Sequence, residues 1–505
     1  MGLFKKVLIA NRSEIALRVQ ATCHMLDIDT VAVFSNEDRH ASFVRNATES
    51  YMLTLNGYQG YLDTDTIIAI AHKSGADAIH PGYGFLSENA SFAQKVIDAG
   101  LTWIGPHPHS ITQMGDKLQA RALMQQAGIP VIPGFVVENV SSSYYADIKD
   151  RAAVIGYPLI IKDPRGGGGK AMRCVRREQD FIQALEAVIA EANKLTGSST
   201  LLIERYIECG RHIEIQVAGD GNRYVHMFER ECSIQRRHQK MIEETPCNFI
   251  PTTLKKSMYK AALCAAQQVA YDSIGTVECI VTPSHDFYFL EMNTRLQVEH
   301  AVTEMTTGID LVALQIHLAA TKKLPLKQKD ITQHGHAIQC RVYAEDPQHN
   351  FAPSVGVINH MSIHKDPFVR IEHDLYNGME VTPFFDPMIA KCSAVGLTRE
   401  LAAARLASYM RQYYLDGIRT NAKFLSNIIS SDEFISGRIH TQMMNDTAFV
   451  ARMNKVHHEH AHNEICAGIA ALIVGLKKTE RAVTSPQNSK QPKINHRRWK
   501  DKQWW

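Results

Sequence analysis

The sequence predicts an α/β and α+β protein whose first domain is built on a parallel β-sheet. Two observations predict that sheet: short apolar runs alternate with helical stretches near the N-terminus, and polar or glycine-rich loops follow two of those runs. A third observation, strand patterns that come ahead of helical patterns later in the chain, predicts the α+β part. With 505 residues, the chain is long enough for about three domains.

The first domain, residues 1–113, is expected to be Rossmann-like. Its apolar runs lie at 7–10, 30–34, 76–79 and 102–104. The polar segment 11–14 follows the first run, and the glycine-containing loop 80–85 follows the third. Loops in these places face the ligand in parallel sheets. Neither loop has the G-x-G-x-x-G pattern, so neither predicts a dinucleotide site.

The second domain, residues 114–329, is marked by four successive glycines. Pro164-Arg165 precedes them and Lys170 follows, and Lys162 ends the strand just before them. Glycines let backbone N–H groups approach a polyphosphate closely, so we expect a mobile, positively charged lid over about 133–203. The run is not a Walker A loop, because the Ser or Thr and the upstream glycine are missing. The alternative is a flexible linker, which Lys162 makes less favourable.

Several segments after the lid have strand patterns. They lie at 202–207, 211–216 and 275–280, and a dense charged run at 229–240 is equally compatible with a solvated face or a site. Glu278 stands in an apolar strand, where a carboxylate is costly unless it is paired or binds a metal. We expect Glu278 and Glu291 to face each other from adjacent antiparallel strands, with His285 and Asp286 in the turn.

The segment 291–300 has several side chains suited to metal and anion binding within ten residues. In an extended chain its odd-numbered polar residues share one side: Glu291, Asn293, Arg295, Gln297 and Glu299. Two carboxylates and an amide oxygen suit a hard cation such as Mg²⁺, and the arginine fork suits a planar oxyanion. The alternative is the polar outer face of a half-exposed strand.

The third domain, residues 330–447, is expected to consist of strands followed by helices, including a helix over 399–414. Arg341 is its single cation in a buried-looking pattern. A helical and basic tail, residues 448–505, follows the third domain.

Composition excludes some classes of function. The net charge of +3 gives no reason to expect nucleic acid or membrane binding. The ten cysteines include no Cys-x-x-Cys pair, which disfavours a zinc site or a disulfide framework and fits a cytoplasmic location. There is no export signal at the start and no apolar run of the roughly eighteen residues that a membrane span needs.

Together these residues resemble the biotin carboxylase family, a branch of the ATP-grasp ligases. The likeness covers about 3–447, and its motifs occur in family order at 10–18, 80–89, 114–117, the four glycines, 232–240, 291–300 and 386–391. The resemblance implies a ligase that uses ATP and bicarbonate, through carboxyphosphate, to carboxylate biotin. It also implies an ATP-grasp domain in the middle and a C-terminal biotin carboxylase domain.

The resemblance also implies a role for individual residues. The expected ATP-binding residues are Lys117, Lys162, Gly168, Gly169, Glu204, Arg205, Tyr206, Ile207 and His238, with His212 nearby. The expected Mg²⁺ or Mn²⁺ ligands are Glu278, Glu291 and Asn293. The bicarbonate pocket is expected to consist of Lys240, Arg295, Gln297, Val298 and Glu299, with Arg341 placed against biotin. The expected catalytic residues are Lys240, Arg295, Arg341 and Glu299, the last as a base whose pKa is raised by burial.

Five positions depart from the family pattern: Ser13, Arg165, Ala171, Arg205 and Ala301. Ser13 and Ala171 stand where glycine is usual, and Ala301 where proline is usual. Alanine in place of glycine disfavours a positive φ, so the lid geometry and the affinity for ATP are the properties we expect to change first.

The expected partners follow from what the sequence lacks. It contains no Met-Lys-Met for biotin attachment and no length for a carboxyltransferase, so we expect a separate biotin carboxyl carrier protein and a carboxyltransferase subunit. The final acceptor, an acyl-CoA such as acetyl-CoA or pyruvate, stays open. A homodimer is expected from the family, with Arg18 near its interface. The alternatives are an ATP-grasp ligase with another acceptor and a scaffold subunit that has lost catalysis.

Two features of the tail suggest further roles. The apolar segment 465–476 and the tryptophans at 499, 504 and 505 suggest docking on a partner, and a frayed end is the equal alternative. Residues 458–462 match H-E-x-x-H, but so short a motif recurs by chance, and a solvated helix start is the better interpretation.

Overall fold

The computed structural model describes residues 3–138, 140, 142–165, 171–197 and 199–455. The described residues up to Asn454 form one compact unit. Gly168, Gly169, the H-E-x-x-H segment, the apolar segment 465–476 and the three C-terminal tryptophans lie outside the described residues.

The N-terminal sheet is parallel, as predicted, with the order β3-β2-β1-β4-β5. Its strands are β1 (Lys6–Ile9), β2 (Asp29–Phe34), β3 (Glu49–Met52), β4 (Ala78–His80) and β5 (Thr102–Trp103). The helices beside it include α1 (Ser13–Met25), α4 (Thr64–Ser74), α5 (Ala90–Asp98) and α6 (Pro108–Gly115). Strand β3 was not predicted, because its exposed and half-buried residues lack an apolar run. The two loops at the carboxyl ends of β1 and β4 meet where the Asn11 side chain donates to the carbonyls of Pro81 and Tyr83.

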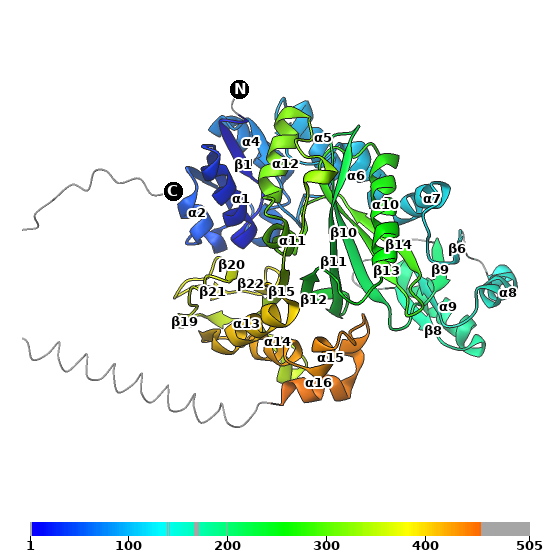
Figure 1. Cartoon of the computed structure of the whole chain (residues 1–505). Coiled ribbons are helices and arrows are strands. Elements are labelled where there is room, and N and C mark those ends of the chain that lie inside the picture. Colours follow the sequence, from blue (N-terminus) through cyan, green and yellow to red (C-terminus); the bar gives the residue numbers. More distant parts are fainter. Residues whose placement is uncertain (1–2, 139, 141, 166–170, 198, 456–505) are drawn as a thin grey trace, which may run out of the picture. The chain divides into compact units, whose positions relative to one another are not determined.

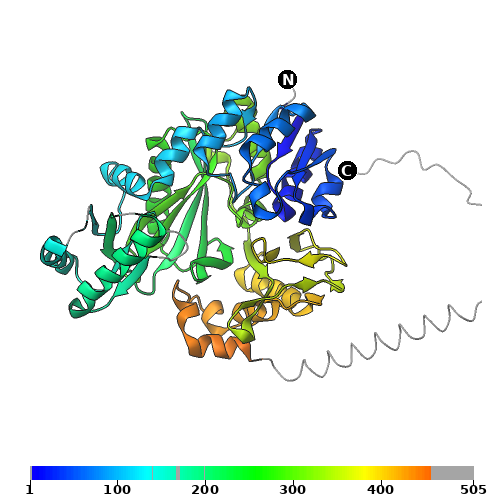
Figure 2. The ribbon, with the colours of Figure 1, turned by 180° about the vertical axis from the view of Figure 1, so that it is seen from behind.

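A small antiparallel sheet with the order β6-β9-β7-β8 forms the lid region. Its strands are β6 (Gly134–Val137), β7 (Leu159–Lys162), β8 (Met172–Val175) and β9 (Leu201–Arg205). Helices α8 (Tyr145–Ile155) and α9 (Phe181–Leu195) share an apolar core with this sheet through residues such as Phe181 and Leu185. In Figures 1 and 2 this region lies on the far side of the central green strands from the blue N-terminal sheet.

The central sheet is antiparallel and has the order β14-β13-β10-β11-β12-β15-β22-β20. Its strands, in chain order, are β10 (Arg211–Gly219), β11 (Tyr224–Arg236), β12 (Gln239–Thr245), β13 (Ile274–Val281), β14 (Phe287–Asn293), β15 (His336–Tyr343), β20 (Val369–His373) and β22 (Met388–Gly396). Because β12 pairs with β15, one continuous sheet joins the predicted second and third domains. Helix α10 (Thr252–Gln268) belongs to the apolar core against β10.

The C-terminal elements pack on the end of that sheet around their own core. The helices include α13 (Arg399–Gln412), α14 (Ala422–Ile429), α15 (Asp432–Ile435) and α16 (Thr447–Asn454). The predicted helix over 399–414 is confirmed apart from its last two residues, since Tyr414 begins the short strand β23 (Tyr414–Asp416). None of the helices in the described ranges is long and apolar enough to cross a membrane.

Candidate active site

Three carboxylates lie in one row across the central sheet. Glu214 on β10 is directly opposite Glu278 on β13, and Glu278 is directly opposite Glu291 on β14. The predicted pairing of Glu278 with Glu291 is therefore confirmed, and the chain between these two strands runs through His285 and Asp286. Glu214 was not among the predicted site residues. The signal in the sequence that could have identified it is the alternation of His212, Glu214 and Gln216 along one strand.

The ammonium group of Lys240 forms ion pairs with three acidic residues of the site. Its Nζ lies 2.5 Å from Glu214, 2.7 Å from Glu278 and 2.7 Å from Glu299. Burial alone would lower the pKa of Lys240, but the three surrounding carboxylates raise it well above its ordinary value. Lys240 therefore stays protonated and holds the negative groups together.

Glu299 is held between two cations. Lys240 binds its Oε1, and Nη2 of Arg341 donates to its Oε2 at 2.9 Å. The expectation that burial raises the pKa of Glu299 is wrong. Burial and the nearby Glu214 do favour the neutral form, but Lys240, Arg341 and Arg230 outweigh them and lower the pKa below its ordinary value. A buried carboxylate with this pKa is ionised at neutral pH, which is the form that a general base needs.

Arg341 has a second carboxylate partner, which the sequence did not reveal. Its Nε donates to Oε1 of Glu243 on the neighbouring strand β12. Two nitrogens of the guanidinium, Nε and Nη2, are therefore oriented by buried acids. A further buried arginine, Arg230, donates to Glu214 and Gln216 from β11. The charged run 229–240 is therefore largely an internal part of the site rather than a solvated face.

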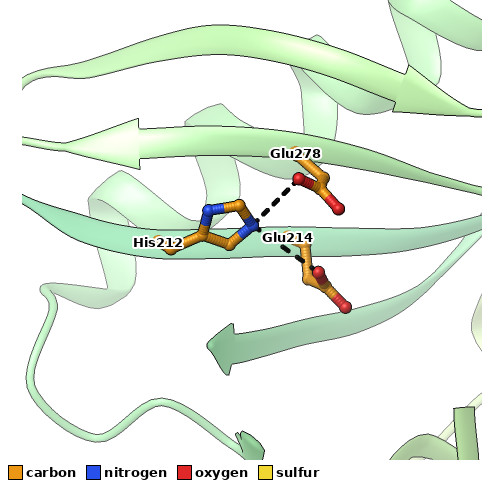
Figure 3. Close-up of side chains that lie close together, drawn as sticks. All are labelled: His212, Glu214 and Glu278. Atoms are coloured by element: carbon orange, nitrogen blue, oxygen red, sulfur yellow. Dashed lines mark ion pairs between the residues drawn. The ribbon is translucent and has the colours of Figure 1, made fainter. Parts of the chain in front are cut away.

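His212 lies beside the carboxylate row, as Figure 3 shows. Its Nε2 is 3.1 Å from Glu278 and 3.7 Å from Glu214. Burial opposes the charged imidazolium, but the Glu278 charge prevails and raises the pKa of His212 to about 9. Ligand atoms of His212, Glu214 and Glu278 all lie within 4.8 Å of one another. Carboxylate oxygens crowded in this way suit a hard divalent cation, so the residues present fit a metal at this row.

The segment 291–300 differs from its predicted extended form. Strand β14 ends at Asn293, and helix α11 (His300–Thr307) begins directly after Glu299. Glu88, which was not among the predicted site residues, binds the chain just beyond the strand. Its carboxylate accepts the backbone N–H of Thr294 at 3.2 Å and the Nε–H of Arg295 at 2.8 Å.

The loop nevertheless returns the predicted side chains to the carboxylate row. Asn293 and Gln297 both donate to Oε1 of Glu278, at 2.8 Å and 3.0 Å. Nη2 of Arg295 donates to Oδ1 of Asn293 at 2.9 Å. The carbonyl oxygen of Val298 accepts from Lys391 at 3.1 Å. Asn293, the last residue of β14, therefore contacts the row from the strand, and the loop that follows brings Gln297 back to the same carboxylate.

The expectation of a single buried cation in the C-terminal part is also wrong. Arg341 is not the single buried cation of the C-terminal part, because Lys391 is 0% exposed and Arg399 is 2% exposed. Lys391 pairs with Glu372 at 2.8 Å, and Arg399 forms a bidentate pair with Glu244. Their partners lie on other strands, so the sequence around each cation gave no sign of its burial.

Other predicted residues surround a second group of cations. Glu204 on β9 forms ion pairs with Lys162 of β7 at 2.5 Å and with Arg121 at 2.7 Å. Lys117 begins helix α7 (Lys117–Gln126), whose first turn is capped by the Asp116 carboxylate. His238 lies at the tip of the β11–β12 hairpin, and burial, Lys162 and Lys117 all lower its pKa. Two lysines whose charge reaches the same histidine provide a favourable place for phosphate oxygens.

Arg205, Tyr206 and Ile207 lie at the end of β9 and directly after it. Nη2 of Arg205 donates to the carbonyl of Ile155 at 3.0 Å, so the cation is attached to the lid helix α8. Strand β9 ends at Arg205, two residues before the predicted end. Tyr206 and Ile207 therefore belong to the connector between β9 and β10.

The departures from the family pattern have local consequences. Ser13 and Ala171 both keep a positive φ, at 57° and 50°, although neither is glycine. Ala171 is buried, and its N–H donates to Glu191 at 2.9 Å. Ala301 lies in the first turn of α11, where a proline is also tolerated because no intrahelical acceptor is needed. The backbone N–H of Arg165 donates to Asp163 at 2.9 Å.

An acidic row on an antiparallel sheet, two lysines beside it and a small second sheet define a nucleotide-dependent ligase of the ATP-grasp kind. The family models agree along the chain. Residues 3–111 match the N-terminal domain of biotin carboxylase, residues 116–327 match the ATP-binding domain of the carbamoyl-phosphate synthase L chain, and residues 339–446 match the C-terminal domain of biotin carboxylase.

Two curated proteins and one solved structure are similar over most of the chain. Biotin carboxylase from Halalkalibacterium halodurans is 44% identical, covering 90% of this chain and 99% of that protein. The mitochondrial methylcrotonoyl-CoA carboxylase subunit alpha of Rattus norvegicus is 43% identical, covering 95% of this chain and 67% of that protein. The biotin carboxylase domain dimer of Hydrogenobacter thermophilus 2-oxoglutarate carboxylase, solved with MgADP, ADP and bicarbonate, has a TM-score of 0.84 at 40% identity, covering 90% of this chain and 99% of that one. The chain belongs to the biotin carboxylase family of ligases.

Proposed function

We propose that this protein uses ATP, Mg²⁺ or Mn²⁺ and bicarbonate to carboxylate biotin that is attached to a separate carrier protein. The observation that supports this most directly is the Glu299 carboxylate, which is bound on one oxygen by Lys240 and on the other by Arg341. That arrangement combines an ionised base with cations that stabilise developing oxyanions.

Binding of the nucleotide is proposed for the second group of residues. It consists of Lys117, Lys162, Gly168, Gly169, Glu204, Arg205, Tyr206, Ile207, His212 and His238. Glu278, Glu291 and Asn293 are the proposed metal ligands, and a metal ion there would supply positive charge to the phosphate oxygens of ATP. Glu214 is a further candidate ligand because its carboxylate lies in the same row.

The chemistry proposed for the pocket is proton transfer and charge stabilisation. Arg295, Gln297, Val298 and Lys240 hold bicarbonate, and Glu299 accepts its proton. The deprotonated oxygen attacks the γ-phosphorus of ATP, the bond to ADP breaks, and carboxyphosphate forms. Carboxyphosphate then breaks into CO₂ and phosphate, and that phosphate takes the ureido proton of biotin. Arg341 stabilises the negative oxygen of biotin while its nitrogen attacks the carbon of CO₂.

The proposed partners are a biotin carboxyl carrier protein, a carboxyltransferase subunit and a second copy of this chain. The relatives act on different acceptors, methylcrotonoyl-CoA and 2-oxoglutarate among them, so we propose that the carboxyltransferase selects the final acceptor. Arg18 forms ion pairs with Glu304 and Asp310 beside a cavity of about 560 Å³, at the place proposed for the dimer contact. The nine cysteines in the described ranges are free, which supports a cytoplasmic location.

The test is phosphate release by the purified protein with MgATP, bicarbonate and free biotin. The expected result is ATP cleavage that depends on bicarbonate and is stimulated by biotin. Cleavage that ignores biotin would favour a ligase with another acceptor. Absence of any cleavage, together with normal assembly of Glu291→Gln into its complex, would favour the scaffold alternative.

A further inference from the structure

The connector between β9 and β10, residues 206–210, is hydrogen-bonded to a segment more than 230 residues further along the chain. Oε1 of Gln442 accepts the backbone N–H of Cys209 at 2.7 Å. Nε2 of Gln442 donates to the carbonyl of Ile207 at 3.0 Å and to the hydroxyl of Tyr206 at 3.3 Å. The next residue back, Thr441, donates its backbone N–H to the carbonyl of Gly210 at 2.9 Å.

These bonds use both ends of one planar amide, so the connector is fixed in position and in orientation. A side chain that only accepts or only donates does not reproduce this pattern. The bond to Cys209 also has a local role, because Cys209 has a φ of 51°. Such a conformation costs a non-glycine residue energy, and it persists only where the surroundings stabilise it. Gln442 supplies part of that stabilisation.

The connector belongs in part to the proposed nucleotide site, so these hydrogen bonds bear on nucleotide binding. It begins with Tyr206 and Ile207, which belong to the proposed nucleotide site, and it follows the end of β9, where Glu204 binds Lys162. It is also the single chain segment between the last lid strand, β9, and the first strand of the central sheet, β10. Gln442 comes from the C-terminal part of the chain and is not itself a proposed ligand of ATP.

We propose that Gln442 is a positioning residue for the nucleotide: its amide orders the backbone of Tyr206 and Ile207 before ATP binds. This inference rests on the proposed function, which places ATP against that segment. A preordered segment loses less conformational entropy on binding, so the gain appears in the affinity for nucleotide and not in the chemical step. The C-terminal part thereby contributes to a site built mainly by the ATP-grasp part.

The test compares Gln442→Leu, which removes both ends of the amide, with Gln442→Glu, which keeps an acceptor for Cys209 but replaces the donor. We expect the KM for ATP to rise about tenfold in Gln442→Leu, corresponding to the loss of hydrogen bonds of modest net strength. The KM for bicarbonate and kcat should stay within about twofold of the wild type. In Gln442→Glu the carboxylate faces the Ile207 carbonyl, so the rise should be at least as large.

The matched control is Gln412→Leu, since the Gln412 side chain donates to the Ser408 carbonyl at the exposed end of α13. It should leave the KM for ATP unchanged. Calorimetric binding of MgADP should weaken in parallel with the KM for ATP in the Gln442 variants. Amide hydrogen exchange of 206–210 without nucleotide should become faster.

Two outcomes would overturn the inference while leaving the proposed function intact. One is a Gln442→Leu enzyme whose KM for ATP lies within twofold of the wild type. The other is an equal rise in the KM for ATP and for bicarbonate, because that pattern indicates general loosening of the fold. If Gln442→Leu does not fold, the same two criteria apply to Gln442→Glu. A wild-type protein that neither binds MgADP nor cleaves ATP would instead contradict the proposed function and the inference with it.

Discussion

Glu299 and Arg341, which are 42 residues apart in the sequence, form a buried ion pair in which Nη2 of the arginine lies 2.9 Å from Oε2 of the carboxylate. The other carboxylate oxygen of Glu299, Oε1, lies 2.7 Å from Nζ of Lys240. Lys240 and Arg341 together explain why a carboxylate with 0% exposure has a lowered pKa. The ion pair with Arg341 also places the proposed base beside the cation proposed to stabilise biotin. Deprotonation of bicarbonate and carboxylation of biotin are therefore proposed for the same side of the site.

Glu299→Gln should reduce kcat for biotin-dependent ATP cleavage by at least about a hundredfold, since loss of a general base typically costs that much. The affinity for MgADP, measured by calorimetry, should stay within about threefold, because Glu299 is not a proposed nucleotide ligand. Glu380→Gln is the control, since Glu380 is exposed and is not a proposed site residue. A Glu299→Gln enzyme with at least a tenth of the wild-type kcat would contradict the role of Glu299 as base.

Glu291→Gln should raise the Mg²⁺ concentration needed for half-maximal activity about tenfold or more, because a neutral amide is a weaker ligand for a hard cation. Burial and the charge of Glu278 raise the pKa of Glu291, as expected for two facing acids without a bound cation. Manganese binding, followed by electron paramagnetic resonance, gives a second measurement. Unchanged metal dependence would remove Glu291 from the ligand set.

Ser13→Gly should increase the free energy of unfolding by up to about 1 kcal/mol, because glycine adopts the observed φ of 57° without the cost that serine bears there. Urea unfolding measures the change. Ser257→Gly, in the exposed face of α10, should have the opposite sign and cost about 0.5–1 kcal/mol. If both variants lose stability equally, the positive φ of Ser13 has no energetic consequence.

The stability of the protein should depend on His80 in mild acid. Burial, helped by Arg18, lowers the pKa of His80 to about 3, whereas an unfolded histidine titrates near 6.5. The unfolded state therefore binds the proton first, and the stability present above pH 6.5 falls as the pH drops toward 3. Between pH 7.5 and pH 5 this group should account for about 2 kcal/mol.

His80→Gln tests that dependence, because glutamine does not titrate in this range and offers an acceptor for the N–H of Gly82, which His80 now binds at 3.0 Å. The variant should lose about 2 kcal/mol less than the wild type between pH 7.5 and pH 5 in urea unfolding. Identical pH profiles for the two proteins would show that His80 is not the group responsible.

Local sequence patterns predicted the elements that depend on neighbours in the chain. The apolar runs at 7–10, 30–34, 76–79 and 102–104 led to four of the five parallel strands. The strand, turn and strand around His285 placed Glu278 opposite Glu291. The period of two in a strand and the chemistry of a short turn are set within about ten residues, so they can be read from the sequence.

The prediction of an extended segment after Glu291 was wrong, because the conformation there does not depend on neighbours in the chain alone. The alternation of this segment continues to Glu299, yet the chain leaves the sheet at Asn293, and beyond that point Thr294 and Arg295 are bound by Glu88, a residue of another domain. A local pattern contains no information about such a partner. The same limitation hid Glu243, which orients Arg341.

Residue type and short-range spacing in the sequence determined the parallel and antiparallel sheets. The family and most of the proposed site residues came from the resemblance of its motifs to the biotin carboxylase family. The tertiary structure alone decided that Glu299 is ionised between Lys240 and Arg341 and that Gln442 holds the connector after β9. Both depend on atoms brought together from distant segments. Electrostatic energy and hydrogen bonding vary with the distance between atoms in space, and separation along the chain does not define that distance.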